Sequence, residues 1–398
     1  MMLPNGWKKV KLGDVAKVTS GGTPLRTQSE YWNGNIPWVK TAQIQNEHIS
    51  KDQVDEYITE LGVKESSAKI VPKGTLLMAM YGQGKTRGQV AILDIDATIN
   101  QACAAFHLKE DEVSTQYLFQ YFLFNYENIR NLSNDGGQKN LSAEIIKKIP
   151  LDLPPIEEQK KIAATLSVWD SAIEKMEKLI DAKESLLTEY GKELFGRTEQ
   201  RQNENWSTIA LSDVLNEHGD KSTGKEEVFS VSVHKGLVNQ IEHLGRSFAA
   251  KDTSNYNRVH YGDIVYTKSP TGDFPLGIVK QSLVKEDVIV SPLYGVFTPK
   301  TFELGAILDF YFSSPINANN YLHPVAQKGA KNTINITNKK FLSAKLRLPI
   351  DIKEQKKIAQ FVQTTKKEKA VLQDILENYK KQKKGLMQKL LTGQWRVK

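Results

Sequence analysis

The most chemically suggestive stretch of this sequence is Gly82-Gln83-Gly84-Lys85-Thr86, which has the composition of a phosphate-binding loop. The full nucleotide-binding motif needs another glycine five residues before Gly84, where this chain has Ala79, and no long helical pattern follows. We therefore predict no nucleotide site here. Glycines let backbone N–H groups approach phosphates, and Lys85 and Arg87 supply charge, so the loop favours contact with a nucleic-acid backbone.

Two further stretches imitate catalytic motifs. Ser291-Pro292-Leu293-Tyr294 has Leu293 where amino-methyltransferases have a second proline, and no glycine-rich cofactor motif accompanies it. Asp351 with Glu354-Gln355-Lys356 imitates the acidic–lysine pattern of some nucleases, but the same residues recur elsewhere as a predicted helix start. The seven histidines are dispersed, and the single cysteine, Cys103, lies in an apolar run. The sequence thus predicts no catalytic residue and no metal site.

The composition is that of an ordinary globular protein, with 39 % hydrophobic and 25 % charged residues among 398. The net charge of +8 is concentrated in one segment. Residues 352–398 hold thirteen Lys or Arg and four Asp or Glu, whereas residues 156–199 hold seven and ten. With one cysteine, no apolar leader and no run long enough to span a bilayer, we expect a cytoplasmic protein without membrane contact.

The chain consists of two tandem copies. Glu158-Gln159-Lys160-Lys161-Ile162-Ala163 recurs 196 residues later as Glu354 to Ala359. Three further pairs of matching segments follow the same order at nearly the same offset: Trp7 to Val15 with Trp206 to Val214, Lys73 to Leu77 with Tyr261 to Val265, and Asn140 to Ser142 with Asn335 to Thr337. Each copy is a globular region of about 150 residues followed by a long segment of alternating polar and apolar character.

The two long segments, Ile156 to Phe195 and Ile352 to Leu391, are predicted to be helices. Apolar residues recur at steps of three, four and seven. Helices of about 60 Å most simply bury these stripes on each other, although each helix packing on its own domain or on a partner is the alternative. The predicted interface is Ile162, Leu166, Trp169, Ile173, Met176 and Leu179 in the first helix, and Ile358, Val362, Leu372, Ile375, Tyr379 and Leu386 in the second.

The predicted fold class is therefore α/β (α+β). Two mixed α/β domains of short strands stand in a pseudo-two-fold arrangement, separated by two long antiparallel coiled-coil helices. The predicted boundaries are residues 1–155 for the first domain, 156–199 for the first helix, 200–351 for the second domain and 352–398 for the second helix.

The sequence resembles the specificity subunits of type I restriction–modification systems. Several segments carry the resemblance, and together they cover essentially the whole chain. The segments are Gly6-Trp7 with Leu12-Gly13-Asp14-Val15, Ile36-Pro37-Trp38-Val39, Asn140-Leu141-Ser142, Leu153 to Ile162, and Lys384 to Gly393. The second copy departs from the pattern, because Leu348-Pro349-Ile350-Asp351-Ile352 replaces the double proline before the helix.

This resemblance implies a role for each part. The globular copies would be target recognition domains, each reading one half of a split double-stranded DNA sequence. The helices would be spacers that pair and dock two methyltransferase subunits, and motor–nuclease subunits would join through the complex. S-adenosylmethionine, ATP and Mg²⁺ would belong to those partners, with no cofactor in this chain.

Candidate DNA contacts are polar or basic residues beside glycines or at predicted strand ends, where loops place side chains into a groove. They are Lys40, Thr41, Gln83, Lys85, Arg87, Gln138, Lys139 and Asn140 in the first copy, and Lys235, Lys268, Lys328, Lys331 and Asn332 in the second. Each is alternatively an ordinary solvated side chain. The copies diverge most in these loops, which indicates an asymmetric target. The basic run from Lys366 to Lys384 contacts DNA, forms the outer face of the coil or docks a subunit.

Other functions are compatible with the same features. A stand-alone architectural or regulatory DNA-binding protein would work without a methyltransferase, and a fused or truncated enzyme component would carry out chemistry itself. A purely structural coiled-coil scaffold is a third alternative, but it does not explain the two globular domains. Co-purification with methyltransferase subunits and an assay of methyl transfer by the chain alone distinguish the first two from a specificity subunit.

Overall fold

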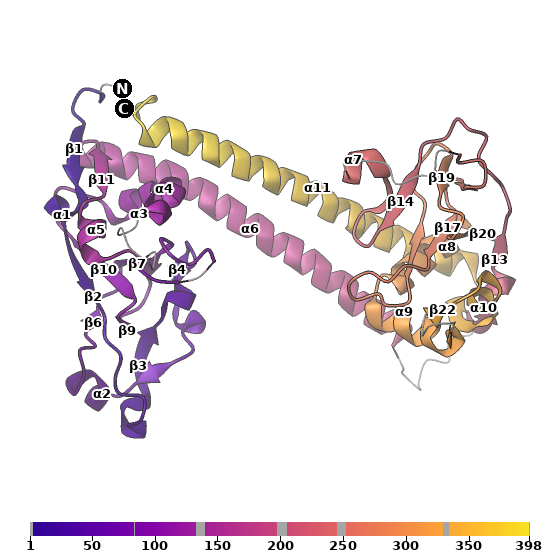
Figure 1. The fold of residues 1–398 in the computed structure, drawn as a ribbon, viewed down its shortest axis with the longest axis horizontal. Helices are drawn as coiled ribbons and strands as arrows, with labels where there is room; N and C mark the ends of the chain where they lie inside the picture. The colour runs from indigo at the N-terminus through magenta and orange to yellow at the C-terminus, as the bar shows by residue number, and fades with distance from the viewer. Residues whose placement is uncertain are drawn as a thin grey trace. The chain divides into compact units, whose positions relative to one another are not determined.

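A computed structural model describes residues 3–82, 84–132, 140–196, 205–244, 252–328 and 334–397. The chain folds into two compact units, residues 1–177 with 374–398 and residues 178–373. Each unit combines one globular copy with part of both long helices, α6 (Ile156–Phe195) and α11 (Ile352–Leu391), which confirms the mixed α/β class with two long helices (Figure 1).

The first globular copy contains two main sheets. Its five-stranded sheet has the order β2 (Ala16–Ser20), β10 (Cys103–Leu108), β7 (Leu76–Ala79), β8 (Val90–Leu93) and β4 (His48–Ile49). Its four-stranded sheet has the order β5 (Tyr57–Ile58), β3 (Trp32–Val39), β9 (Ala97–Ile99) and β6 (Ile70–Val71). The pair β1 (Lys8–Lys11) and β11 (Pro150–Leu153) leads into α6. The helices of this copy are α1 (Leu12–Val15), α2 (Glu60–Lys64), α3 (Thr115–Phe124), α4 (Tyr126–Asn131) and α5 (Ala143–Lys147).

The second globular copy has a four-stranded sheet in the order β13 (Leu215–Glu217), β20 (Gly295–Pro299), β17 (Ile264–Thr267) and β18 (Ile278–Gln281). Its two-stranded sheets are β12 (Trp206–Ala210) with β23 (Lys345–Pro349), β14 (Phe229–Ser232) with β15 (Gly236–Asn239), β16 (Asn257–Val259) with β19 (Val288–Val290), and β21 (Gln327–Lys328) with β22 (Ile334–Asn335). Its helices are α7 (Gln240–Leu244), α8 (Phe302–Phe312), α9 (Pro315–Leu322) and α10 (Asn338–Ser343).

The strand order shows that the sequence repeat is a structural repeat. The order β2-β10-β7-β8 of the first copy corresponds to β13-β20-β17-β18 of the second, and all of these neighbours are antiparallel. The register agrees as well. Phe106 pairs with Val18 and Leu76, and Phe297 pairs with Glu217 and Ile264.

The repeated hexapeptide places one glutamine in the same structural position in both units. The buried Gln159 accepts a hydrogen bond from the Ser114 amide at 2.9 Å, and its amide group donates to the carbonyls of Glu112 and Pro154, both at 2.9 Å. This glutamine therefore joins the start of α6 to the start of α3 and to the end of β11.

Gln355 has the equivalent role in the second unit. It accepts from the Thr301 hydroxyl at the start of α8 at 2.8 Å and donates to the Pro349 carbonyl at 3.0 Å. The nuclease-like Asp351 accepts from the Glu354 amide at 3.0 Å. That bond explains the motif as the cap of a helix start, as the repeat predicts.

Within the first unit, α6 and α11 pack against each other. Ile162 and Leu166 are buried in one core with Leu390, and the rings of Trp169 and Tyr379 meet edge to face at 5.5 Å. Lysines of α11 pair with acids of α6: Lys380 with Glu177 at 2.5 Å, and Lys383 with Asp170. Rising residue numbers on α6 meet falling numbers on α11, so the helices are antiparallel here.

The same antiparallel pairing is present within the second unit. Lys183 pairs with Glu368 at 2.6 Å, and Glu184 pairs with Lys369. The ring of Tyr190 lies 4.4 Å from that of Phe361. In this unit Ile358 and Val362 are buried in the core of the second globular copy.

A three-and-four residue spacing runs along both helices, and every residue on it is buried or half-buried. The positions are 162, 166, 169, 173, 176, 180, 183, 187, 190 and 194 on α6, and 358, 362, 365, 369, 372, 376, 379, 383, 386 and 390 on α11. Leu179 lies off this spacing and is 45 % exposed, whereas Ile180 continues it. Ile375 is half-buried beside Leu376, which takes the spaced position.

Replacing Gln159 by alanine tests the anchor of α6. Gln159→Ala leaves the Ser114 amide and two carbonyls without their partner in a buried site, so we expect a loss of about 3 kcal/mol in the free energy of unfolding. The measurement is the midpoint of urea unfolding. Lys160→Ala, which changes the exposed neighbour, should stay within about 0.5 kcal/mol of the wild type. Equal midpoints for the two variants would contradict this role of the glutamine.

Candidate DNA interface

The glycine-rich loop of the first unit connects β7 to β8 and is held by α4. The Tyr126 hydroxyl donates to the carbonyl of Lys85, and the Arg130 guanidinium donates to the carbonyl of Gly84. Arg87 in turn donates to the Arg130 carbonyl at 2.9 Å. The loop is thus fixed through its backbone, while the Lys85 side chain is exposed to solvent.

Glycine is required in this loop for conformational reasons. Gly82 has φ 141°, and a Cβ there would lie 2.7 Å from the Thr86 side chain. Gly84 and Gly88 also adopt positive φ, a region that other residues rarely occupy. The glycines therefore shape the turn that carries Lys85 and Arg87.

The corresponding loop of the second unit connects β17 to β18 and contains Lys268. This loop closes on itself, because Thr271 and Phe274 exchange backbone hydrogen bonds of 3.1 and 2.9 Å. Burial lowers the pKa of the Lys268 amine, and nearby Glu217 opposes that shift. The two loops thus occupy equivalent places in the repeat but present different side chains.

Lys40, at the end of β3, is already neutralised by carboxylates. Its amine lies 3.0 Å from Asp55 and 2.5 Å from Glu56, and the hydrogen bond to Glu56 raises the pKa of Lys40. Glu56 also pairs with Arg26 at 2.5 Å. Lys40 therefore has less charge to offer a phosphate than its position in the sequence suggests.

Arg26 is a candidate that the sequence reasoning missed. Its guanidinium lies over the Trp32 ring at 3.7 Å and near the Trp38 ring at 4.8 Å, and its side chain is 53 % exposed. A planar cation held on an indole keeps its orientation while remaining accessible. Trp32 and Trp38, six and twelve residues after Arg26, are the only sign of this contact in the sequence. The bulge in strand β3 brings both rings to Arg26.

Backbone hydrogen bonds bring several predicted contacts of the first unit to one edge. Asn140 precedes Leu141, whose amide donates to Met80 at the start of the glycine-rich loop. In the turn after β9, the Asn100 amide donates to the Val39 carbonyl, at the end of β3 and beside Lys40 and Thr41. The Ala102 carbonyl in the same turn accepts from the Met80 amide. In the second unit Lys235 is exposed in the β14–β15 turn, and Lys328 lies in β21. Gln83, Gln138, Lys139, Lys331 and Asn332 lie outside the described residues.

Most lysines of the basic run of α11, from Lys366 to Lys384, form ion pairs with acidic residues. Lys369, Lys380 and Lys383 pair with acids of α6 as described above. Lys366 donates to Asp309 of α8 at 2.6 Å, and Lys280 lies 3.8 Å from the same carboxylate. Burial alone would raise the pKa of Asp309, but the two lysines outweigh it and hold that pKa below its usual value. These contacts favour helix pairing over DNA contact for this run.

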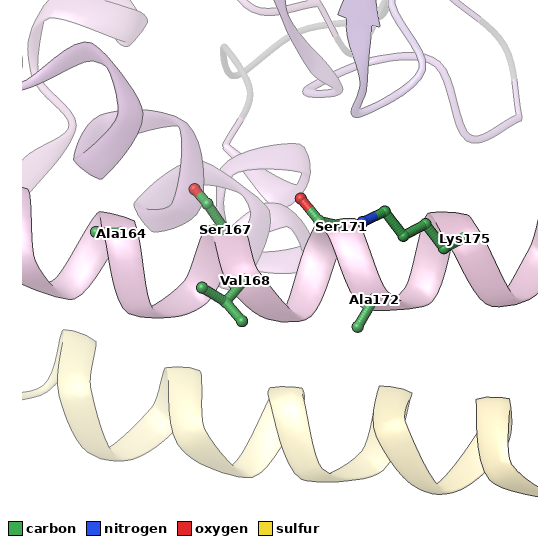
Figure 2. Close-up of a pocket in the computed structure, with 6 residues that line it drawn as sticks. All are labelled: Ala164, Ser167, Val168, Ser171, Ala172 and Lys175. Atoms are coloured by element: carbon green, nitrogen blue, oxygen red, sulfur yellow. The ribbon is translucent and has the colours of Figure 1, made fainter.

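A shallow depression of about 440 Å³ lies along α6 in the first unit (Figure 2). Figure 2 shows Ser167 and Ser171 on one side of the helix axis and Val168 and Ala172 on the other. The Val168 side chain is 69 % exposed. The lining residues follow a three-and-four spacing and are mostly small: Ala164, Ser167, Val168, Ser171, Ala172 and Lys175. An exposed apolar residue among small neighbours gives a surface that another helix can approach closely.

The sole cysteine is buried and chemically quiet. Burial raises the pKa of the Cys103 thiol to about 12, so the thiolate is scarce near neutral pH. Among the described residues, no helix is both long enough and apolar enough to cross a bilayer.

Comparison with known proteins identifies relatives of this chain. The family described as the type I restriction modification DNA specificity domain matches residues 4–184. The chain is 28 % identical over 280 residues to the type I restriction enzyme MjaIX specificity subunit of Methanocaldococcus jannaschii, a match that covers 66 % of this chain and 63 % of that protein. It is 23 % identical to the MjaVIII specificity subunit of the same organism over 100 % of this chain and 95 % of the relative.

The fold has a counterpart among solved structures. The crystal structure of the type I restriction–modification S subunit from M. genitalium superposes with a TM-score of 0.65 at 15 % identity, covering 98 % of both chains. At this identity the similarity concerns the fold, which is shared from end to end.

Replacing Lys85 by alanine tests the loop as a phosphate contact. We expect Lys85→Ala to weaken binding of target and non-target DNA to similar extents, and to reduce the slope of log K against log salt by about 0.9. Lys73→Ala is the matched control, because Lys73 is also exposed but precedes β7, at the opposite end from the loop. Fluorescence anisotropy at several salt concentrations measures both effects. An unchanged salt slope would remove Lys85 from the interface.

Proposed function

This chain belongs to the family of specificity subunits of type I restriction–modification systems, and from that premise we propose that it reads a DNA target made of two different half-sequences at a fixed separation. As a specificity subunit it is the DNA target-recognition member of its system and not the catalytic one. Each globular copy is proposed to read one half of the target.

The divergent loops support two different half-sequences. The repeat conserves the strand order β2-β10-β7-β8 and its register. The loop after β7 and the loop after β17 have the same length but differ in glycine content and anchoring. A conserved sheet with varied loops is the usual way in which one scaffold acquires a new binding specificity. An asymmetric target follows from this difference.

The antiparallel pairing of α6 with α11, found within both units, is the observation on which the proposal of fixed separation depends. Two 40-residue helices that share one apolar stripe resist bending better than a single helix or a flexible linker does. At 1.5 Å per residue such a pair extends about 60 Å, enough to set two readers a turn or more of B-DNA apart.

The partners follow from the same premise. We propose that two methyltransferase subunits dock on the helices and methylate adenine in both half-sites, and that motor–nuclease subunits join through them. S-adenosylmethionine, ATP and Mg²⁺ are assigned to those partners. The depression around Val168 on α6 is the proposed contact for one methyltransferase subunit. We also propose that the chain works in the cytoplasm.

Lengthening both helices tests the proposed ruler. One heptad is inserted after Ala182 in α6 and one after Lys369 in α11, so that the pairing of Lys183 with Glu368 and of Glu184 with Lys369 keeps its register. Seven residues add about 10.5 Å, so the permitted gap should grow by about three base pairs, or binding at the original gap should be lost.

The readout is binding to DNA in which the gap varies while the half-sequences stay constant. A heptad inserted in α6 alone is the control, because it breaks the pairing on one side and should abolish binding at every gap. If the double insertion leaves the preferred gap unchanged, the helices do not measure distance.

Replacing Ala164 by arginine tests the docking surface. Ala164→Arg places a long charged side chain in the depression, so we expect at least a tenfold loss of affinity for the methyltransferase subunit, or about 1.4 kcal/mol. Ala182→Arg, at another exposed alanine of the same helix, should leave co-purification unchanged. Equal recovery with both variants would exclude this surface. Failure of the wild type to recover a methyltransferase would favour a stand-alone DNA-binding protein.

A further inference from the structure

A cluster of histidines and aspartates lies in the second unit, away from the loop that contains Lys268. His218 follows β13, Asp220 lies two residues later, and His260 follows β16. Each offers one ligand atom, and the three atoms lie within 4.8 Å of one another. The chain brings them together by pairing the backbone around Asp220 with that around Asn257, so their spacing along the chain does not indicate a site.

The orientation of each imidazole is fixed by a second carboxylate. Nε2 of His218 lies 2.9 Å from the buried Asp263, and Nδ1 of His260 lies 2.8 Å from Asp287. If each of these nitrogens donates its proton to its carboxylate, the other nitrogen of each ring carries a lone pair. That is the arrangement by which proteins orient metal-binding histidines.

The remaining nitrogens both lie near Asp220. Nε2 of His260 lies 3.0 Å from the Asp220 carboxylate, and Nδ1 of His218 lies 3.8 Å from it. Nδ1 of His218 is buried and has no hydrogen-bond partner among the described residues. A buried acceptor without a donor costs free energy. A cation bound between Nδ1 of His218, Nε2 of His260 and the Asp220 carboxylate would remove that cost.

The charges of the cluster also favour a cation. Arg258 lies 4.0 Å from Asp220, 3.9 Å from Asp287 and 4.0 Å from Glu226. Together with Asp263, which contacts His218, the cluster contains four carboxylates and one guanidinium, so three negative charges are in excess when both imidazoles are neutral. Burial alone would lower the pKa of His260, but its hydrogen bonds to Asp220 and Asp287 outweigh burial and raise that pKa. Without a metal, a protonated His260 is therefore the competing cation.

From this geometry we propose that His218, Asp220 and His260 bind one divalent transition-metal ion of the zinc type, with Asp263 and Asp287 orienting the two imidazoles. Two imidazoles and one carboxylate suit Zn²⁺, and a solvent molecule would complete a tetrahedron. In a tetrahedral site with metal–ligand distances of about 2.0 Å, the ligand atoms lie about 3.3 Å from one another. Small side-chain rotations would bring the three ligand atoms, now within 4.8 Å of one another, to that separation. Asp220 is 47 % exposed, which gives the ion a path of entry.

The site is specific to the second copy. The shared strand register aligns His218 with Thr19 and Asp263 with Thr75. The turn before β17 corresponds to the turn before β7, which aligns His260 with Pro72. The first copy thus has other residues at these positions. The ion would join the segment after β13 to β16 and to the start of β17, at the opposite end of β17 from Lys268. It therefore has a structural role in the second unit and does not contact DNA through that loop.

Zn²⁺ binding to the purified full-length chain tests this site in the absence of DNA, so its outcome is independent of the proposed DNA function. After treatment with EDTA and dialysis, calorimetric titration with Zn²⁺ should show one ion per chain, and Zn²⁺ should raise the midpoint of thermal unfolding. His218→Ala should weaken binding at least a hundredfold. Asp287→Asn, which changes an exposed residue outside the ligand set, should weaken it about tenfold.

His48→Ala is the matched control, because His48 forms a similar pair with Asp94 at 3.0 Å in the first unit but without a second histidine. This variant should bind Zn²⁺ as the wild type does. The proposal is overturned if the wild type binds no Zn²⁺, or if His218→Ala and Asp287→Asn bind it as tightly as the wild type. Asp287→Asn decides the question if the substitution at His218 prevents folding.

Discussion

Burial of one apolar stripe on another is the constraint from which the rest of this molecule follows. Each of the two 40-residue helices has an apolar stripe at three-and-four spacing, and a small globular copy can cover only part of it. In the first unit Ile162 and Leu166 of α6 meet Leu390 of α11, and in the second unit Ile358 and Val362 join the core of the second copy. Each unit is therefore built from the start of one helix and the end of the other.

The charge pattern follows from the same pairing. The chain has a net charge of +8, but the positive excess lies mainly in α11 and the segment after it. Lys369, Lys380 and Lys383 face acids of α6, and Lys366 is bound by Asp309 of α8. Antiparallel pairing places these charges opposite each other, so these lysines are balanced by acidic residues of the same chain. We propose that DNA contact depends on a few exposed loop residues, such as Lys85.

The features that repeat along the chain were predictable from the sequence. Helical periodicity predicted α6 and α11 with their observed ends, and the duplicated hexapeptide predicted two equivalent helix starts, because local pattern determines both. Where two apolar residues are adjacent, the pattern predicts the interface only to within one residue. Leu179 is a predicted interface residue, but Ile180 holds the spaced position, because it is the residue that continues the alternating steps of three and four along α6.

Side-chain partners that depend on the tertiary fold were not predictable. Lys40 was a DNA candidate by its place after a strand, yet Asp55 and Glu56, fifteen and sixteen residues later, neutralise it. Arg26 was missed because its stacking on Trp32 and Trp38 depends on the bulge in β3. The histidines looked dispersed because His218 and His260 meet only when β13 and β16 are in place.

Mapping N6-methyladenine across the genome, in cells with and without this gene, tests the central claim most directly. The account predicts a set of methylated sites that disappears with the gene and shares two different half-sequences separated by one constant gap. A methylated sequence without a gap, or two half-sequences at many different separations, would contradict a pair of readers held apart by paired helices.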